Sequence, residues 1–99
     1  MAKLTCLKSV SQWEDEQTFT YPVLRFFIDK LKRKILDKPE SGFDDPILSR
    51  SGKIIPCKKQ SVNIGIFSRQ YAIGYNFLTV NYIYEKESSE IIVVRLNYS

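Results

Sequence analysis

Histidine is absent from all 99 residues. Its absence excludes nucleophilic sites that pair Ser or Cys with His, general bases made from imidazole, and zinc sites with a His ligand. The four glycines are scattered, so the chain has no glycine-rich phosphate-binding loop. With no metal motif and no cofactor motif present, we expect neither a metal nor a cofactor.

Cysteine and long apolar runs are scarce as well. The two cysteines, Cys6 and Cys57, lie far apart in the chain, and we expect them to be reduced thiols buried as small apolar side chains. The longest purely apolar run is four residues, Ile91 to Val94, against the ~20 that a membrane-spanning helix needs. The first residues contain no apolar core of a signal peptide. We therefore expect a cytoplasmic protein that makes no contact with a membrane.

The composition is that of a folded globule. Hydrophobic residues make up 43% and charged residues 26% of the chain, which includes six Phe, six Tyr and one Trp. These side chains can supply a core without disulfides, and no change in composition divides the chain. Residues 1–99 are predicted to form a single domain.

One helix is predicted over residues 22–37. Pro22 suits a first helical turn, and Pro39 lies just beyond the end, where it stops the helix. Apolar side chains recur at helical spacing, and we expect this stripe to pack on a sheet while the basic residues between its members face water. The stripe consists of Leu24, Phe27, Ile28, Leu31 and Ile35.

Around this helix the pattern is weaker. Residues 3–8 alternate weakly and predict a first strand. The polar segment 9–20 reads as a loop or a short helical turn. Residues 39–52 read as an irregular connection, long enough to be functional or mobile.

The second half of the chain alternates as strands do. Val62, Ile64 and Ile66 predict a half-buried strand. Large residues then occupy odd positions over 71–77 and even positions over 78–84. A strand cannot change phase in this way without a bulge or a turn, which we expect between residues 74 and 78.

The end of the chain predicts a hairpin. Residues 85–89 are polar and suit its loop, and residues 91–96 are apolar on both faces, as in a central strand. The predicted fold class is α+β, with one main amphipathic helix packed on an antiparallel sheet of four to five strands.

Positive charge is concentrated in the second half of the chain. Residues 50–99 hold seven basic and three acidic residues, and the stretch from Arg50 to Arg69 holds five cations and no carboxylate. Such a stretch attracts phosphate or an acidic protein surface. We therefore expect a partner that is an acidic protein surface or a nucleic acid. The predicted binding residues are Arg50, Lys53, Lys58, Lys59, Arg69 and Tyr71.

One reaction remains open to a chain without histidine. RNA can be cleaved by its own 2′-hydroxyl when cations stabilise the phosphorane and a Lys or Tyr moves the proton. The alternative for the tyrosines is cross-strand packing, which sheets favour. Residues of the required types in or beside predicted strands are Lys58, Lys59, Arg69, Tyr71, Arg95 and Tyr98.

A basic amphipathic helix, then strands, then a last hairpin ending Ile-Ile-Val-Val-Arg-Leu-Asn-Tyr (91–98) resembles the RelE/ParE superfamily of small toxins. The likeness covers residues 22–38 and 78–98 and is one of pattern, so it transfers no residue roles. It implies a small basic protein that cuts messenger RNA on the ribosome or inhibits gyrase.

Two functions follow from these observations. We favour a small non-catalytic binding protein, namely an inhibitor, an immunity protein or a phage-type antagonist that occludes an acidic protein or a nucleic-acid-associated partner. Tyr and Arg, the residue types that often carry interface energy, are available for it. The alternative is a toxin of the RelE/ParE type, acting as a metal-independent ribonuclease or as a gyrase inhibitor.

Overall fold

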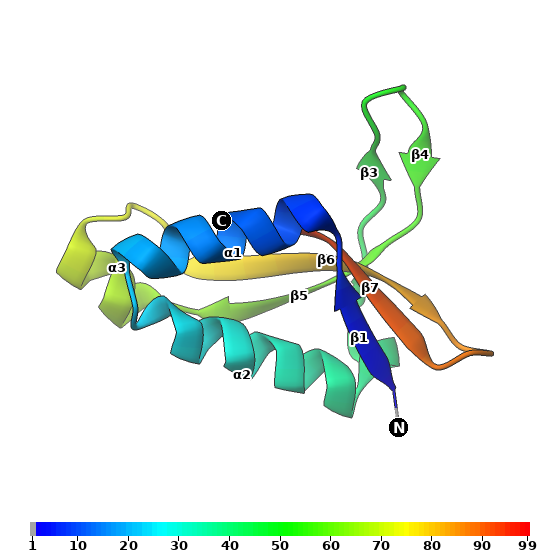
Figure 1. Cartoon of the computed structure of the whole chain (residues 1–99), viewed down its shortest axis with the longest axis horizontal. Helices are drawn as coiled ribbons and strands as arrows, with labels where there is room; N and C mark the ends of the chain where they lie inside the picture. The colour runs from blue at the N-terminus through cyan, green and yellow to red at the C-terminus, as the bar shows by residue number, and fades with distance from the viewer. Residues whose placement is uncertain (1) are drawn as a thin grey trace.

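The computed structural model describes residues 2–99 and contains three α-helices, a five-stranded sheet and a two-stranded sheet (Figure 1). In chain order the elements are β1 (Lys3–Cys6), α1 (Lys8–Thr20), α2 (Leu24–Asp37), the 3-10 helix η1 (Pro39–Ser41), β2 (Phe43–Asp44), β3 (Ile47–Leu48), β4 (Ile54–Ile55), β5 (Lys58–Asn63), α3 (Gly65–Tyr71), β6 (Phe77–Glu85) and β7 (Glu90–Tyr98). Within residues 2–99, no helix is long and apolar enough to cross a membrane.

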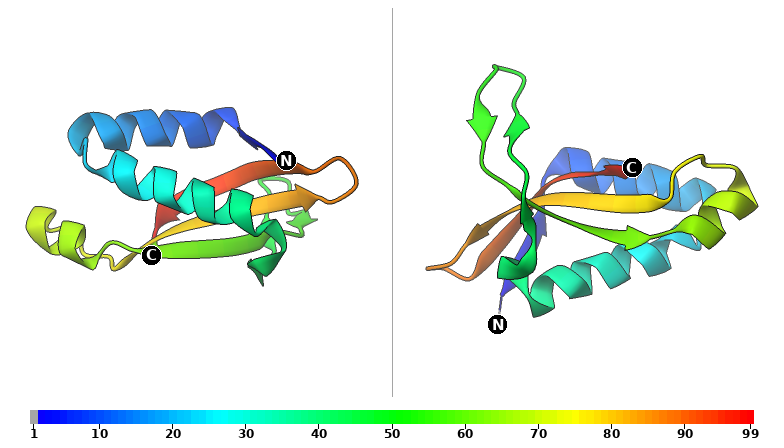
Figure 2. Two further views of the ribbon diagram at one scale, coloured as in Figure 1. Left: turned by 90° about the horizontal axis from the view of Figure 1, so that it is seen from below. Right: turned by 180° about the vertical axis from the view of Figure 1, so that it is seen from behind.

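The main sheet has the strand order β1-β7-β6-β5-β2. Helices α1 and α2 lie side by side on one of its faces, and over the described chain no helix covers the other face (Figure 2). The α+β class is confirmed. The expectation of one main helix on an antiparallel sheet is wrong on two points, because α1 is a second helix and β1 pairs with β7 in parallel.

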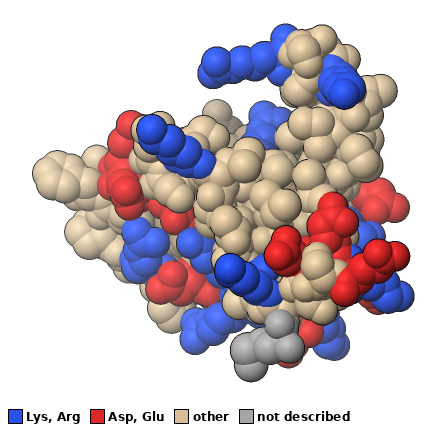
Figure 3. Space-filling view, turned by 45° about the vertical axis from the view of Figure 1, so that its right-hand side comes forward, with Lys and Arg blue, Asp and Glu red and all other residues tan. Residues whose placement is uncertain are grey.

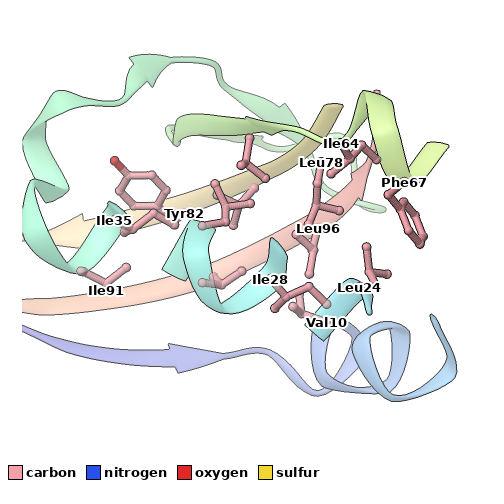
Figure 4. Close-up of a cluster of buried hydrophobic side chains, with 14 residues drawn as sticks. Val10, Leu24, Ile28, Ile35, Ile64, Phe67, Leu78, Tyr82, Ile91 and Leu96 are labelled. Carbon is pink, nitrogen blue, oxygen red and sulfur yellow. The ribbon is translucent and has the colours of Figure 1, made fainter. Parts of the chain in front are cut away.

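The core lies between α2 and the sheet. Leu24, Ile28, Leu31 and Ile35 are each at most 1% exposed and meet side chains of β6 and β7 (Figure 4). The predicted helix and stripe are confirmed for these four residues. Phe27, the fifth, is half-buried at the edge of the core, with its ring centroid 5.9 Å from that of Phe67.

The prediction of a loop or short helical turn over residues 9–20 is wrong, since α1 occupies this segment. The helix buries only Val10 and Glu14, so its sequence shows little apolar period. Contacts from distant parts of the chain hold it instead. The Trp13 ring packs edge-on against Tyr98 at 5.3 Å between centroids, and the Glu14 carboxylate lies 2.8 Å from Lys32 Nζ.

The connection expected to be irregular, 39–52, runs into a long bent hairpin. Its two strands keep one register throughout, with Phe43 opposite Lys59 and Leu48 opposite Ile54. Pro46 falls opposite Pro56 in this register, and because proline has no N–H, the ladder is interrupted on both strands at that point. Beyond the two prolines β3 and β4 leave the body of the molecule (Figure 1). We call residues 46–56 the arm.

The predicted strand over residues 62–66 ends earlier than expected. The Asn63 side chain accepts a hydrogen bond from the Gly65 backbone N–H at 2.8 Å, which turns the chain out of β5 and into α3. Ile66, expected to face the core, is 76% exposed on this short helix. The three alternating apolar residues therefore do not share one strand: Val62 lies near the end of β5, and Ile66 lies in the first turn of α3.

The strand expected over residues 71–77, before the predicted change of phase, is wrong, because a helix end and a turn occupy residues 71–76. Helix α3 ends at Tyr71, and Ala72 and Gly74 adopt left-handed backbone angles, with φ of 55° and 86°. Strand β6 begins only at Phe77, so residues 71–84 do not form one uninterrupted strand. The hairpin loop over 85–89 and the central position of the last strand, between β1 and β6, are confirmed.

Candidate functional site

The face of the sheet without helices carries a set of polar side chains that three strands place in rows. Lys59, Asn81 and Arg95 are cross-strand neighbours on β5, β6 and β7, and the next row along the strands is Ser61, Thr79 and Asn97. Phe77 and Ser99 follow, joined by two backbone hydrogen bonds of 3.0 and 2.9 Å. We call these eight residues the polar strip. Together with Asp45 they line an open hollow of about 350 Å³.

A bulge in β7 directs Arg95 onto this face. Tyr82 of β6 pairs with Val93, but the preceding residue, Asn81, pairs with Arg95, so Val94 is the extra residue. The bulge reverses the alternation of β7. Before it, Val93 faces the helices. After it, Leu96 faces the helices and Arg95 the open side. Without the bulge, this cation would point toward the core.

Hydrogen bonds hold the centre of the polar strip. Thr79 is 9% exposed, and its hydroxyl lies 2.9 Å from that of Ser61 and 2.5 Å from that of Ser99. Asn81 is 3% exposed and donates from Nδ2 to the Asp45 carboxylate at 3.0 Å. Because these side chains already bond to their neighbours, holding them in place costs less entropy on binding.

The charge of the strip comes from Lys59 and Arg95. Lys59 Nζ lies 4.0 Å from the Asp45 carboxylate, a distance at the limit of an ion pair. Arg95 is exposed and has no ion pair within residues 2–99. The hollow therefore holds two cations against one carboxylate and favours an anionic ligand.

The other reactive side chains are poorly placed for chemistry on this face. Burial raises the pKa of the Cys57 thiol, and the charge of Asp45 raises it further. Burial also raises the pKa of Tyr98 to about 12. The Tyr98 hydroxyl points to the helix side, where it donates to Gln17 at 2.8 Å. In the described part of the chain, no three His, Cys, Asp or Glu side chains gather as metal ligands do. Asp45 and Lys59 are the acidic and basic side chains that, with Arg95, line this hollow.

The structure distributes the predicted binding residues over four places. Arg50 and Lys53 stand at the end of the arm, and Lys59 lies on the polar strip. Lys58 bonds to Asp44 at 3.1 Å beside the arm. Arg69 and Tyr71 belong to α3, at the far end of β5. The ring of Tyr71 packs on those of Tyr21 and Phe67, with 5.2 Å between centroids in each pair.

Sequence reasoning missed most of the polar strip. It named Arg95 only as a residue for RNA cleavage, and it did not name Thr79, Asn81 or Asn97 as binding residues. A signal was present, since polar residues alternate with apolar ones at 79 and 81 and again at 95, 97 and 99. That alternation is typical of a strand with one uncovered face.

Comparisons of the chain with protein-family models, with curated proteins and with solved structures found no match.

Proposed function

We propose that this protein is a small binding protein that holds a single strand of nucleic acid on the polar strip and acts by occluding it. The observation that carries the proposal is the cross-strand placement of Lys59 and Arg95 on an uncovered face, in register with hydroxyl and amide side chains. No catalytic step is part of this proposal.

The order of side chains along the strip suits such a ligand. Lys59 and Arg95, at one end, can contact phosphates, which supply most of the affinity for nucleic acid. Phe77, at the other end, is 44% exposed and offers a ring on which a base can stack. Phe77 lies four positions before Asn81, the residue that pairs with both cations, so the two ends are about 13 Å apart in an extended strand. The side chains of Ser61, Asn97 and Ser99 are half-buried or exposed, and their hydroxyl and amide groups can both donate and accept hydrogen bonds with base edges.

Binding to short oligonucleotides tests the proposal. Fluorescently labelled single strands of RNA and of DNA, equal in sequence and length, are titrated with protein at several salt concentrations. We expect saturable binding. The logarithm of the binding constant should fall linearly with the logarithm of the salt concentration. The double variant Lys59→Ala/Arg95→Ala removes two phosphate contacts and should lower that slope by about 1.4.

The matched control is Lys30→Ala/Arg33→Ala, which removes one exposed Lys and one exposed Arg from α2. An equal loss in both double variants would mean that net charge alone drives binding, and the strip would not be the site. Poly-glutamate is added as a competitor. If it displaces the strand as well as unlabelled oligonucleotide does, the strip binds carboxylates equally and the partner is an acidic protein.

A second candidate function is RNA cleavage, as in a toxin of the RelE/ParE type. One observation favours it, since Lys59 lies 4.0 Å from Asp45 and on the same face as Arg95, which is two strands away. In RNA cleavage a Lys or a carboxylate can transfer the proton, and cations such as Lys and Arg can stabilise the charge on a phosphorane. Incubating the labelled RNA with protein in the presence of a chelator and running a denaturing gel tests it. Cleavage that Lys59→Ala abolishes would replace the binding role by a catalytic one, and intact RNA would exclude cleavage of this substrate.

A further inference from the structure

The arm is the part of the molecule that packs least against the rest of the fold. It projects beyond the sheet and the helices, and its end carries cationic side chains (Figures 1 and 3). Arg50 and Lys53 are both exposed there. Just below them the cross-strand pair Leu48 and Ile54 is 72% and 70% exposed. Two large aliphatic side chains held in water, next to two cations, suit an element that contacts a partner.

The end of the arm is an ordered turn. The Ser49 N–H donates to the Lys53 carbonyl at 2.8 Å, and the Lys53 N–H donates to the Ser49 hydroxyl at 3.1 Å. Gly52 adopts a φ of 81°, which a residue with a side chain rarely adopts. These bonds fix where Arg50 and Lys53 leave the backbone, so binding need not order the loop first.

The charges on the arm are not neutralised within the protein. No Asp or Glu occurs from Pro46 to Tyr84, and neither Arg50 nor Lys53 has an ion pair within residues 2–99. At the base of the arm the situation differs, because Lys58 and Lys59 lie 3.1 and 4.0 Å from Asp44 and Asp45. Charge complementarity therefore assigns an anionic partner to the end of the arm.

We propose that the arm enters the major groove of a B-form duplex that adjoins the single strand held on the polar strip. This inference rests on the proposed function and names its ligand as a junction between single-stranded and double-stranded DNA. Asp45, the residue before the arm, lines the hollow of the polar strip. A strand that leaves the strip at this end therefore runs alongside the arm.

The dimensions and chemistry of the arm fit that groove. The major groove of B-form DNA is about 12 Å wide and admits a two-stranded β-ribbon, whose strands lie about 4.8 Å apart. Arg50 and Lys53 would contact phosphates at the groove edges. Leu48 and Ile54 would face base edges, where thymine presents a methyl group. The major groove of A-form RNA is deep and narrow and excludes such a ribbon.

Binding of matched probes tests the inference. One probe is a single DNA strand, the second is the same strand extended by a DNA hairpin stem, and the third carries an RNA stem. We expect the DNA stem to raise affinity about tenfold and the RNA stem to have little effect. Arg50→Ala/Lys53→Ala should remove the gain and lower the salt slope for the junction by about 1.8, with single-strand affinity unchanged. Lys30→Ala/Arg33→Ala should keep the gain.

Three results would overturn the inference. The first is a DNA stem that adds no affinity, and the second is an equal gain from the RNA stem. The third combines two measurements. The affinity gained from the DNA stem survives in Arg50→Ala/Lys53→Ala, and light scattering shows that Leu48→Ser/Ile54→Ser converts a dimer into a monomer. The arm would then be a contact between two copies of the chain. A plain DNA duplex is titrated in parallel. If wild type binds it through Arg50 and Lys53 but binds no single strand, the proposed function fails and the groove contact stands.

Discussion

The two faces of β6 differ in chemistry although residues on both faces are buried. Leu78, Val80 and Tyr82 face the helices and are at most 2% exposed, while Thr79 and Asn81, between them, face the open side and are 9% and 3% exposed. On the helix side burial comes from the apolar stripe of α2. On the open side it comes from neighbouring strands and from the segment around Asp45. Low exposure therefore does not by itself mark a residue as part of the hydrophobic core.

The two faces also differ in what they contribute. The helix side removes apolar surface from water, which is the main source of stability. The open side forms hydrogen bonds of about 1 kcal/mol each in net terms, so it contributes little to stability but presents ordered polar groups. If this division is correct, substitutions on the helix side should affect folding, and substitutions on the open side should affect binding.

The largest effect is expected at the centre of the core. Leu31 is 1% exposed, and Leu31→Ala leaves a cavity that neighbouring side chains fill only in part. We expect a loss of about 2–5 kcal/mol in the free energy of unfolding, measured with urea. Phe26→Ala is the control on the same helix, because Phe26 is 59% exposed and should change stability by less than about 0.5 kcal/mol. Equal effects would place the apolar stripe on the wrong side of α2.

The next largest loss of stability is expected when a hydroxyl is introduced on the helix side of β6. Val80 is 2% exposed among apolar side chains. Val80→Thr keeps the shape of the side chain but buries a hydroxyl among apolar neighbours, which should cost about 1–3 kcal/mol of unfolding free energy. Urea unfolding at neutral pH measures it. A change below about 0.5 kcal/mol would mean that the helix side is more hydrated than its packing indicates.

The success of sequence reasoning differed between the two helices. The stripe of α2 repeats every three or four residues, so the helix was predicted from local pattern alone, and four of the five side chains predicted to pack on the sheet are buried. Helix α1 was missed because its partners lie far away in sequence. Trp13 rests on Tyr98, and Glu14 lies beside Lys32. Trp13 and Tyr98 lie near opposite ends of the chain, so no short stretch of sequence shows that they pack together.

The candidate site was predicted in part for the same reason. A run of cations is visible in the sequence, and one of its members, Lys59, does lie on the polar strip. The prediction treated the whole run as one surface, but the chain passes through the arm, β5 and α3 over these residues. Arg95 joins Lys59 only through the register of three strands and the bulge at Val94. Register and bulges depend on pairing between distant residues, which composition does not reveal.

A pH effect is expected where the helix side ends, at Tyr98. Its pKa is raised from 10.0 to about 12, so between these values the folded protein keeps a proton that the unfolded chain releases. Stability from this group is therefore complete below pH 10 and is lost as the pH rises toward 12. Urea unfolding at about pH 8 and about pH 11 should show a larger loss in wild type than in Tyr98→Phe, which cannot titrate. Equal losses would mean that the Tyr98 hydroxyl is not buried against Gln17.

The smallest effect on folding, and the sharpest comparison, is expected at Thr79, next to Val80 on the same strand. Thr79→Val removes a hydroxyl whose partners, Ser61 and Ser99, remain half-buried or exposed and can bond to water instead. We expect a stability loss below about 1 kcal/mol, smaller than that of Val80→Thr, although the two substitutions exchange the same pair of side chains. Binding should respond in the opposite order. Thr79→Val removes a hydrogen-bonding group from the centre of the polar strip and should weaken binding of the single-strand probe about twofold to tenfold, whereas folded Val80→Thr should bind as wild type does. If both variants lose stability equally and neither changes binding, the open side is part of the structural core and not a ligand site.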